Sequence, residues 1–133
     1  MFDESLLLGN TTIDEQHREL FSQLDKISYA CLDGCDEVQL KKMLQFLDDY
    51  TQRHFSHEET VMKQMNYPNI KTQQLQHSVF RQKIQKMLEI NIKELGPDEL
   101  SLMIKRELLN WYTHHIKRLD KEMVNFIKGQ QHY

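Results

Sequence analysis

Four long stretches of the chain carry apolar residues every three or four positions, which is the repeat of an amphipathic helix. No segment alternates apolar and polar residues as a half-buried strand does. After an N-terminal arm of about residues 1–12, the predicted helices cover about residues 14–33, 37–65, 68–95 and 98–128. Short connections make successive helices antiparallel, so we predict one all-α domain over residues 1–133, an up-down-up-down four-helix bundle.

Turn residues mark the expected ends of these helices. Asp36, followed three residues later by Gln39, is typical of a capping pair that opens the second helix. Pro68 is expected to be the first residue of the third helix, because proline fits that position. The apolar repeat is lost over residues 128–133, which indicates a frayed tail or the start of a linker.

Ionisable residues fall on the apolar faces of all four helices, where such groups are costly without a partner. They are His17, His54, Glu58, His77, His115 and Asp120. A single inward histidine is more often a hydrogen-bonded core residue than a ligand, but six such groups together reverse that judgement. No Lys or Arg falls on the same faces to neutralise the two carboxylates, so the pattern indicates a bound cation.

The neighbouring ionisable residues fall on other faces. His57, Glu59 and His114 share outward faces with basic and polar residues and are expected to be solvated. Asp120 comes five residues after His115 and falls on an apolar flank that includes Tyr112. Because a spacing of five fits an α-helix less well than four, this pair is weaker evidence by itself.

The ligand types indicate the metal. Imidazole with carboxylate, and no thiolate, suits iron, manganese or zinc. Two carboxylates among four histidines suit two metal ions better than one, because a carboxylate can bridge them. Helical bundles commonly hold such dinuclear sites.

Charge and composition exclude several classes of protein. A net charge of −3, with basic residues scattered among acidic ones, predicts neither a nucleic-acid partner nor a membrane partner. The acidic start MFDESLLLGN is neither a secretory signal nor a membrane span, so a cytoplasmic location is expected. Nothing near Cys31 and Cys35 is arranged to lower a thiol pKa, so these cysteines are expected to stay reduced.

Four motifs resemble those of bacterial hemerythrin domains, and the match spans nearly the whole chain. They are Ile-Asp-Glu-Gln-His at 13–17, His-Phe-x-x-Glu-Glu at 54–59, Tyr-Pro at 67–68 followed by His77, and Trp-x-x-x-His-Ile at 111–116 followed by Asp120. The resemblance implies two iron ions with an oxo or hydroxo bridge as the cofactor. It assigns His17 and His54 to one iron and His77 and His115 to the other, with Glu58 and Asp120 bridging both.

Gln73 departs from the family pattern, which has a histidine four residues before His77. An amide binds iron weakly, so the resemblance implies an extra open position for water, for an exogenous ligand or for the Gln73 oxygen. In the family, a diferrous site with one vacant position binds O₂ inside an apolar wall. The candidates for that wall are Leu20, Phe21, Phe80, Leu108 and Trp111. A second open position favours oxidation, because it gives solvent access to the metal.

The resemblance and Gln73 together predict a readily autoxidised, O₂-binding domain that acts as an oxygen or redox sensor. NO and small anions such as azide are further expected ligands, and an attached signalling output such as a diguanylate cyclase is compatible with this role. The domain is not expected to be an enzyme. Three alternatives stay open: an oxygen storage or delivery protein, a di-iron peroxidase or oxidase, and a metal-free interaction bundle.

Overall fold

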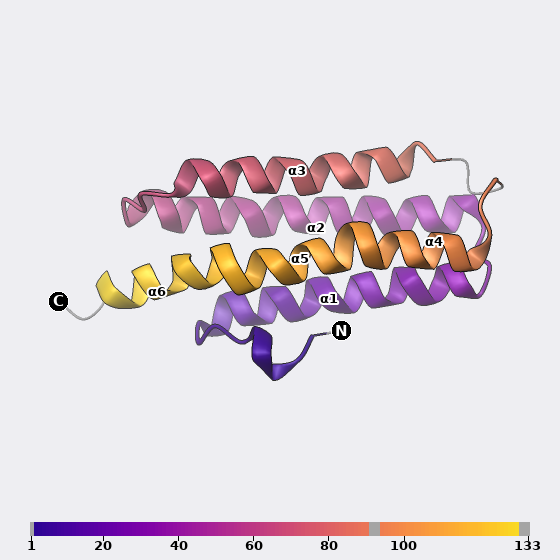
Figure 1. Ribbon diagram of the computed structural model, residues 1–133. Coiled ribbons are helices and arrows are strands. Elements are labelled where there is room, and N and C mark those ends of the chain that lie inside the picture. Colours follow the sequence, from indigo (N-terminus) through magenta and orange to yellow (C-terminus); the bar gives the residue numbers. More distant parts are fainter. Residues whose placement is uncertain (1, 91–93, 131–133) are drawn as a thin grey trace.

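Four helical rods lie side by side in the computed structural model, which describes residues 2–90 and 94–130 (Figure 1). The first three rods are α1 (Thr11–Leu32), α2 (Glu37–Gln64) and α3 (Ile70–Leu88), and a short turn, η1 (Glu4–Leu6), precedes them. Successive rods run in opposite directions, and the described residues contain no strand. The predicted all-α, up-down-up-down bundle is therefore confirmed.

The fourth rod contains two π-helical turns instead of one uninterrupted α-helix over residues 98–128. Its segments are α4 (Pro97–Ile104), η3 (Lys105–Leu109), α5 (Asn110–His115), η4 (Ile116–Asp120) and α6 (Lys121–Gln130), where η3 and η4 are the π turns. A π turn brings residues five apart onto one face, and such turns occur frequently at functional sites.

Side-chain caps set where α1 and α2 begin. The Asn10 side chain accepts a hydrogen bond from the Ile13 amide at 3.1 Å, so α1 begins at Thr11 and not near Asp14. The Asp36 carboxylate caps α2 as predicted, accepting from the Gln39 amide at 2.7 Å. Asp14 also accepts from the amides of Leu8 and Gly9, which ties the N-terminal arm to α1.

Three predicted helix ends are wrong. Pro68 lies in a turn, and α3 begins two residues later at Ile70. At the other end α3 finishes at Leu88, not near residue 95, and residues 91–93 of the predicted helix lie outside the described residues. The fourth rod continues to Gln130. The predicted tail at residues 131–133 also lies outside the described residues.

Two apolar clusters form the core. The larger cluster includes Leu20, Phe21, Phe80, Leu108 and Tyr112, and the smaller one consists of Ile13, Met62, Tyr67, Met123, Val124 and Ile127. Along each rod, the six inward ionisable residues come between members of these two clusters. The fold therefore places a band of histidines and carboxylates across an otherwise apolar interior.

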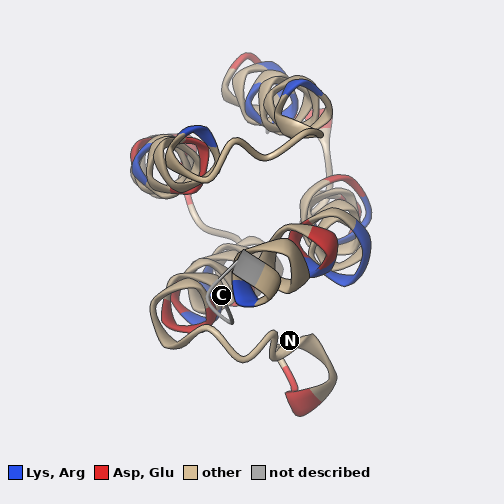
Figure 2. Ribbon diagram, turned by 90° about the vertical axis from the view of Figure 1, so that its left-hand side faces the viewer, with Lys and Arg blue, Asp and Glu red and all other residues tan. Residues whose placement is uncertain are grey.

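Charges of both signs occur along the rods, which Figure 2 shows end-on from the side where α6 finishes. Within the described residues, none of the helices combines the length and the apolar content that crossing a membrane requires.

Candidate metal centre

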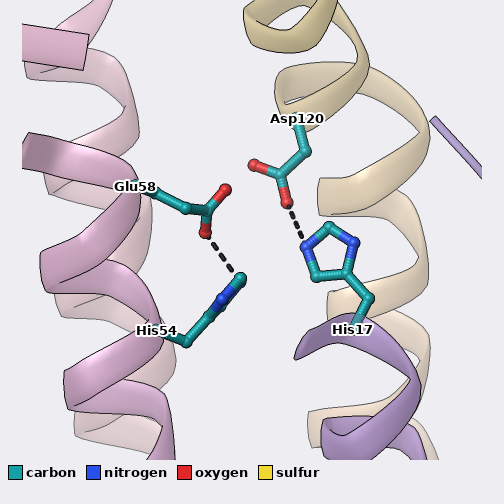
Figure 3. Close-up of side chains that lie close together, drawn as sticks. All are labelled: His17, His54, Glu58 and Asp120. Atoms are coloured by element: carbon teal, nitrogen blue, oxygen red, sulfur yellow. Dashed lines mark ion pairs between the residues drawn. The ribbon is translucent and has the colours of Figure 1, made fainter. Parts of the chain in front are cut away.

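The six inward ionisable side chains are all at most 5 % exposed and meet in the interior. Their ligand atoms form two groups, and within each group the atoms lie within 4.8 Å of one another. The first group is His17, His54, Glu58 and Asp120 (Figure 3), and the second is His77, His115 and Asp120. Asp120 belongs to both groups and therefore joins them.

Helix geometry brings each carboxylate beside a histidine of its own rod. His54 and Glu58 are one α-helical turn apart in α2, with 2.7 Å between His54 Nε2 and Glu58 Oε1. The π turn η4 separates His115 from Asp120, and 3.1 Å separates His115 Nε2 from Asp120 Oδ1. A spacing of five residues is therefore a good fit here, because the rod is locally π-helical. From α1, His17 Nε2 comes within 3.1 Å of Asp120 Oδ2.

These short distances do not give the polar atoms involved a hydrogen-bond partner. The Nε2 atoms of all four histidines are buried without a hydrogen-bond partner, and so are both oxygens of Glu58 and Oδ2 of Asp120. Buried polar atoms in native proteins are normally paired, so this convergence indicates a ligand that accepts electron pairs. Imidazole nitrogens and carboxylate oxygens are donors that fit such a cation, and the absence of a thiolate among them suits iron.

The two carboxylates have opposite pKa shifts. Burial, and then the negative charge of Asp120, raise the pKa of Glu58 well above its usual range. Burial also opposes ionisation of Asp120, but His115 and His17 outweigh it and hold the pKa of that carboxyl well below its usual range. The imidazoles thus stabilise the ionised form of Asp120. Glu58 needs a further positive charge nearby to ionise.

Burial also keeps two of the imidazoles in the form that binds metals. It lowers the pKa of His54 to about 4, and that of His77 also to about 4. Both rings are therefore neutral at neutral pH, with a lone pair available for a metal.

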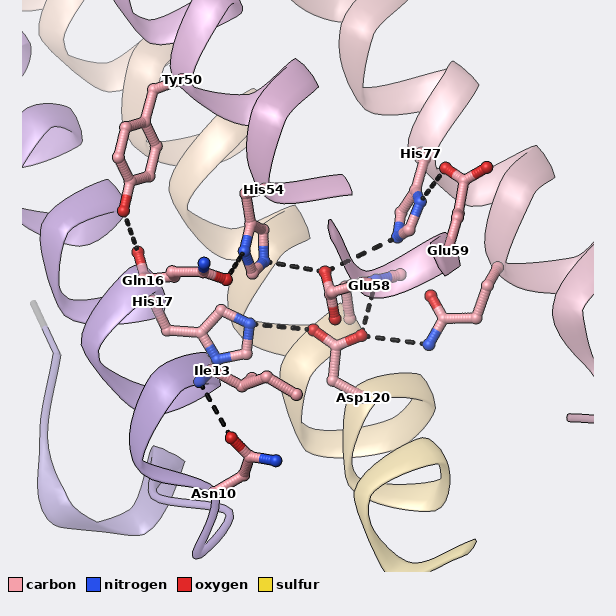
Figure 4. Close-up of polar contacts among 12 residues, drawn as sticks. Asn10, Ile13, Gln16, His17, Tyr50, His54, Glu58, Glu59, His77 and Asp120 are labelled. Atoms are coloured by element: carbon pink, nitrogen blue, oxygen red, sulfur yellow. Dashed lines mark hydrogen bonds and ion pairs between the residues drawn. The ribbon is translucent and has the colours of Figure 1, made fainter. Parts of the chain in front are cut away.

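Outer hydrogen bonds orient the same two rings (Figure 4). The His54 Nδ1 atom lies 2.7 Å from Gln16 Oε1, and the Tyr50 hydroxyl donates to the Gln16 backbone carbonyl at 3.3 Å. The His77 Nδ1 atom lies 3.0 Å from Glu59 Oε2. When each Nδ1 carries the proton and donates it, Nε2 is left free to face a metal.

The expectation that Glu59 is solvated is therefore wrong. Its side chain is only 25 % exposed and accepts a hydrogen bond from a residue of the centre. His57 is half-buried and not fully solvated, whereas His114 is exposed as predicted.

The chain matches the model of the hemerythrin HHE cation binding domain over residues 8–127. The chain belongs to the hemerythrin family. It is 30% identical over 128 residues to a bacteriohemerythrin of Clostridium acetobutylicum, covering 89% of this chain and 93% of that relative. It is 24% identical over 129 residues to a bacteriohemerythrin of Stenotrophomonas maltophilia, covering 97% of this chain and 82% of that relative. No solved structure gives a significant match.

Membership of the hemerythrin family supports a non-haem di-iron, oxygen-binding domain, and the two groups of histidines and carboxylates can hold metal ions. Gln73, at the position where the resemblance predicted a histidine, is 1 % exposed. Its Nε2 donates to Asp120 Oδ1 at 3.0 Å, and its Oε1 is buried without a partner. The second group therefore has two imidazoles and the Asp120 carboxylate, and the amide of Gln73 lies beside that carboxylate.

The predicted apolar wall of this hemerythrin is partly as expected. Leu20, Phe21, Phe80 and Leu108 are buried in the larger cluster. Trp111 is only partly buried, and its ring stacks on His115 at 4.9 Å between centroids and 11° between planes. The role of these five residues around a bound ligand stays a prediction.

Two aromatic residues beside the centre were not predicted. Phe55 stacks on His77 with 3.8 Å between ring centroids, and Tyr112 is fully buried with no partner for its hydroxyl. Burial is also the main cause that raises the pKa of the Tyr112 phenol well above its usual range. Tyr112 precedes His115 by three residues, a spacing that puts both on one helical face and was available as a signal.

Two surface grooves reach the histidines of the second group. The groove between α2 and α3 is lined by Phe55, Glu59 and His77, among others. The other groove is lined by Trp111, His115 and the cations Lys117 and Arg118, among others. Neither of these two grooves is lined by a histidine of the first group. The grooves therefore bring solvent to the outer edges of the His77 and His115 rings, whose Nε2 atoms stay buried.

Proposed function

We propose that this chain is a readily oxidised di-iron domain that binds O₂ and serves as an oxygen or redox sensor. His17 and His54 hold one iron in this proposal, and His77 and His115 hold the other. Glu58 and Asp120 lie between the two positions, where their negative charges offset both cations. When bound, the irons supply the electrons that bind and reduce O₂.

Gln73 is the observation that supports a sensor over a carrier. Its amide nitrogen donates to Asp120 Oδ1, and an amide oxygen is a weak ligand for iron, so the iron at His77 and His115 would have one strong donor fewer than the family pattern provides. Both grooves described above reach His77 or His115, on the same iron. An open position at this iron would give solvent access to the metal, and solvent access favours oxidation, so the oxidation state of this centre should respond quickly to O₂.

Iron content and autoxidation rate test the proposal. We expect an iron-to-chain ratio near two in protein made in iron-replete cells. Gln73→His should then slow autoxidation of the reduced protein in stopped-flow measurements, because it adds the missing donor. Gln45→His is the matched control, since Gln45 is exposed on α2 and bonds only with Asp49 among the contacts described.

The outcomes separate the alternatives. A ratio near one or zero would mean that the dinuclear centre does not assemble, and the sensing mechanism would have to be abandoned. An unchanged decay rate in Gln73→His would show that Gln73 does not shape reactivity. A wild-type oxygenated form that lasts far longer than the mixing time would favour oxygen storage or delivery, and steady-state peroxide turnover would favour a peroxidase.

The sensor role makes one further demand on the protein. Reduced and oxidised forms must differ in conformation, because a signal has to reach another molecule or domain. Hydrogen exchange of the two forms measures this directly, and identical protection patterns would refute the sensor role. A cytoplasmic location and an attached output such as a diguanylate cyclase are part of the same proposal.

A further inference from the structure

Tyr112 carries a fully buried hydroxyl with no hydrogen-bond partner among the described residues. Buried hydroxyls are normally paired, because burial removes the water they would otherwise bind. Packing accounts for the ring but not for its oxygen, since a phenylalanine ring would fill nearly the same space. The hydroxyl therefore indicates a partner that comes from outside the polypeptide.

Three of the four imidazoles of the metal centre surround this phenol. The centroid of the Tyr112 ring lies 5.7 Å from that of His17, 6.0 Å from that of His115 and 6.3 Å from that of His54. The charges of Glu58 and Asp120 both act on the phenol, so it is also within electrostatic reach of the two carboxylates. Tyr112 thus contacts the histidines of both predicted iron positions.

Aromatic packing fixes the ring in place. Its centroid lies 5.3 Å from that of Phe80, 6.0 Å from that of Phe21 and 6.3 Å from that of Phe55, and the Phe55 ring is within 9° of parallel. These neighbours exclude water and leave the ring little freedom to turn away. A hydroxyl held in such a place is a preorganised donor, and its hydrogen bonds are stronger than they would be in water.

We propose that the Tyr112 hydroxyl donates a hydrogen bond to a small ligand at the di-iron centre and so selects ligands that carry negative charge. This inference rests on the proposed function, because the ligand it describes binds at the metals. Tyr112 is a specificity-determining residue in this account. It favours ligands with an acceptor atom, since a ligand without one leaves the buried hydroxyl unpaired.

Azide binding to the oxidised, iron-loaded protein tests the proposal. Tyr112→Phe removes only the hydroxyl, and it should weaken azide binding by about 10-fold or more in an optical titration, as expected for a hydrogen bond to a charged group. Tyr67→Phe is the matched control, because Tyr67 is buried in the smaller apolar cluster. Its azide affinity should equal that of the wild type.

Three further readouts separate the causes of any change. Iron per chain in the wild type tests the proposed function, and its value in Tyr112→Phe shows whether the variant keeps the centre. The metal-free Tyr112→Phe protein should be at least as stable to urea as the metal-free wild type, because its hydroxyl has no partner in the fold. In the wild type alone, the vibration of bound azide should shift in D₂O, because the donated proton exchanges.

Several results would overturn the assignment of Tyr112. With two irons per chain in both proteins, equal azide affinities would refute it while leaving the di-iron centre intact. In the oxidised protein without azide, an intense visible band that disappears in Tyr112→Phe would show that the phenolate is itself an iron ligand and not a donor. Absence of the D₂O shift would refute the hydrogen bond even if the variant fails to fold. A wild type without iron would refute the centre and this inference together.

Discussion

Replacing Glu59 by leucine should weaken metal binding at the end of the centre that contains His77 and His115. The Glu59 carboxylate lies 3.0 Å from His77 Nδ1 and orients the ring so that Nε2 faces the other ligands. Losing such an outer partner typically costs about 10- to 100-fold in metal affinity. Glu59 is 25 % exposed, so water partly replaces its effect and we expect the lower part of this range, about 10- to 30-fold.

Glu59→Gln separates the hydrogen bond from the charge. Its amide oxygen still accepts from His77 Nδ1, as Gln16 Oε1 is placed to do for His54. A neutral hydrogen bond contributes about half the free energy of a charge-assisted one, so the glutamine variant should lose only about 3- to 6-fold. Gln16→Leu is the mirror variant and should weaken the end that contains His54.

Anaerobic competition with a chromophoric chelator for Fe²⁺ measures both affinities. Only the weaker of two resolved binding steps should change in Glu59→Leu, and the exposed Glu99→Leu at the far end of the bundle should change neither. Equal affinities for Glu59→Leu and the wild type would refute the reasoning. Stacking on Phe55, at 3.8 Å between centroids, would then be sufficient to orient the His77 ring.

Two further predictions concern the ligands themselves. His115→Ala should lower iron content while His114→Ala keeps two irons per chain, and loss of iron from His114→Ala would overturn the assignment of the inward face. In metal-free protein, Glu58→Gln should be more stable than the wild type by a margin that grows as the pH rises above the usual pKa of a glutamate. The raised pKa of Glu58 means that the unfolded chain ionises first, so the wild type loses about 1.4 kcal/mol for each pH unit in which only the folded form keeps its proton. Urea unfolding at several pH values measures the margin, and a constant margin would contradict the shift.

The inward faces of the helices were predictable because burial follows a simple repeat. His17, His54 and His77 are buried as their positions in the apolar repeat indicated, and exposed His114 was separated correctly from buried His115. A helical repeat needs only the residues of one helix, so tertiary contacts do not change the answer. The role of these residues as iron ligands stays a prediction.

Features that depend on contacts between helices were not predictable in this way. Glu59 was assigned to the solvent because it shares an outward face of its own helix with basic and polar residues, yet its partner His77 comes from α3. The spacing between His115 and Asp120 was counted as weaker evidence because the usual α-helical period was applied to a segment that is π-helical. Tyr112 was counted as part of an apolar flank, and the isolation of its hydroxyl is visible only once the surrounding rings are in place.

The beginning of α3 shows a similar limit. Pro68 fits the first turn of a helix by its own geometry, but the chain leaves α2 through Asn66 with a φ of 54°, in the left-handed region. The turn then takes three more residues, Tyr67, Pro68 and Asn69, before Ile70 starts α3. Local preference located the break between the helices but not the residue at which the next one begins.

Asp120 affects how a measured iron content is interpreted, because it is a ligand candidate in both groups. Two cations that share one carboxylate cannot bind independently. If an ion at one position changes the affinity of the other position by some factor, an ion at the other position changes the affinity of the first by the same factor, by thermodynamic necessity. In a preparation that averages one iron per chain, the proportions of empty, singly loaded and doubly loaded chains therefore depend on this coupling. The average content does not reveal which of the two positions is filled.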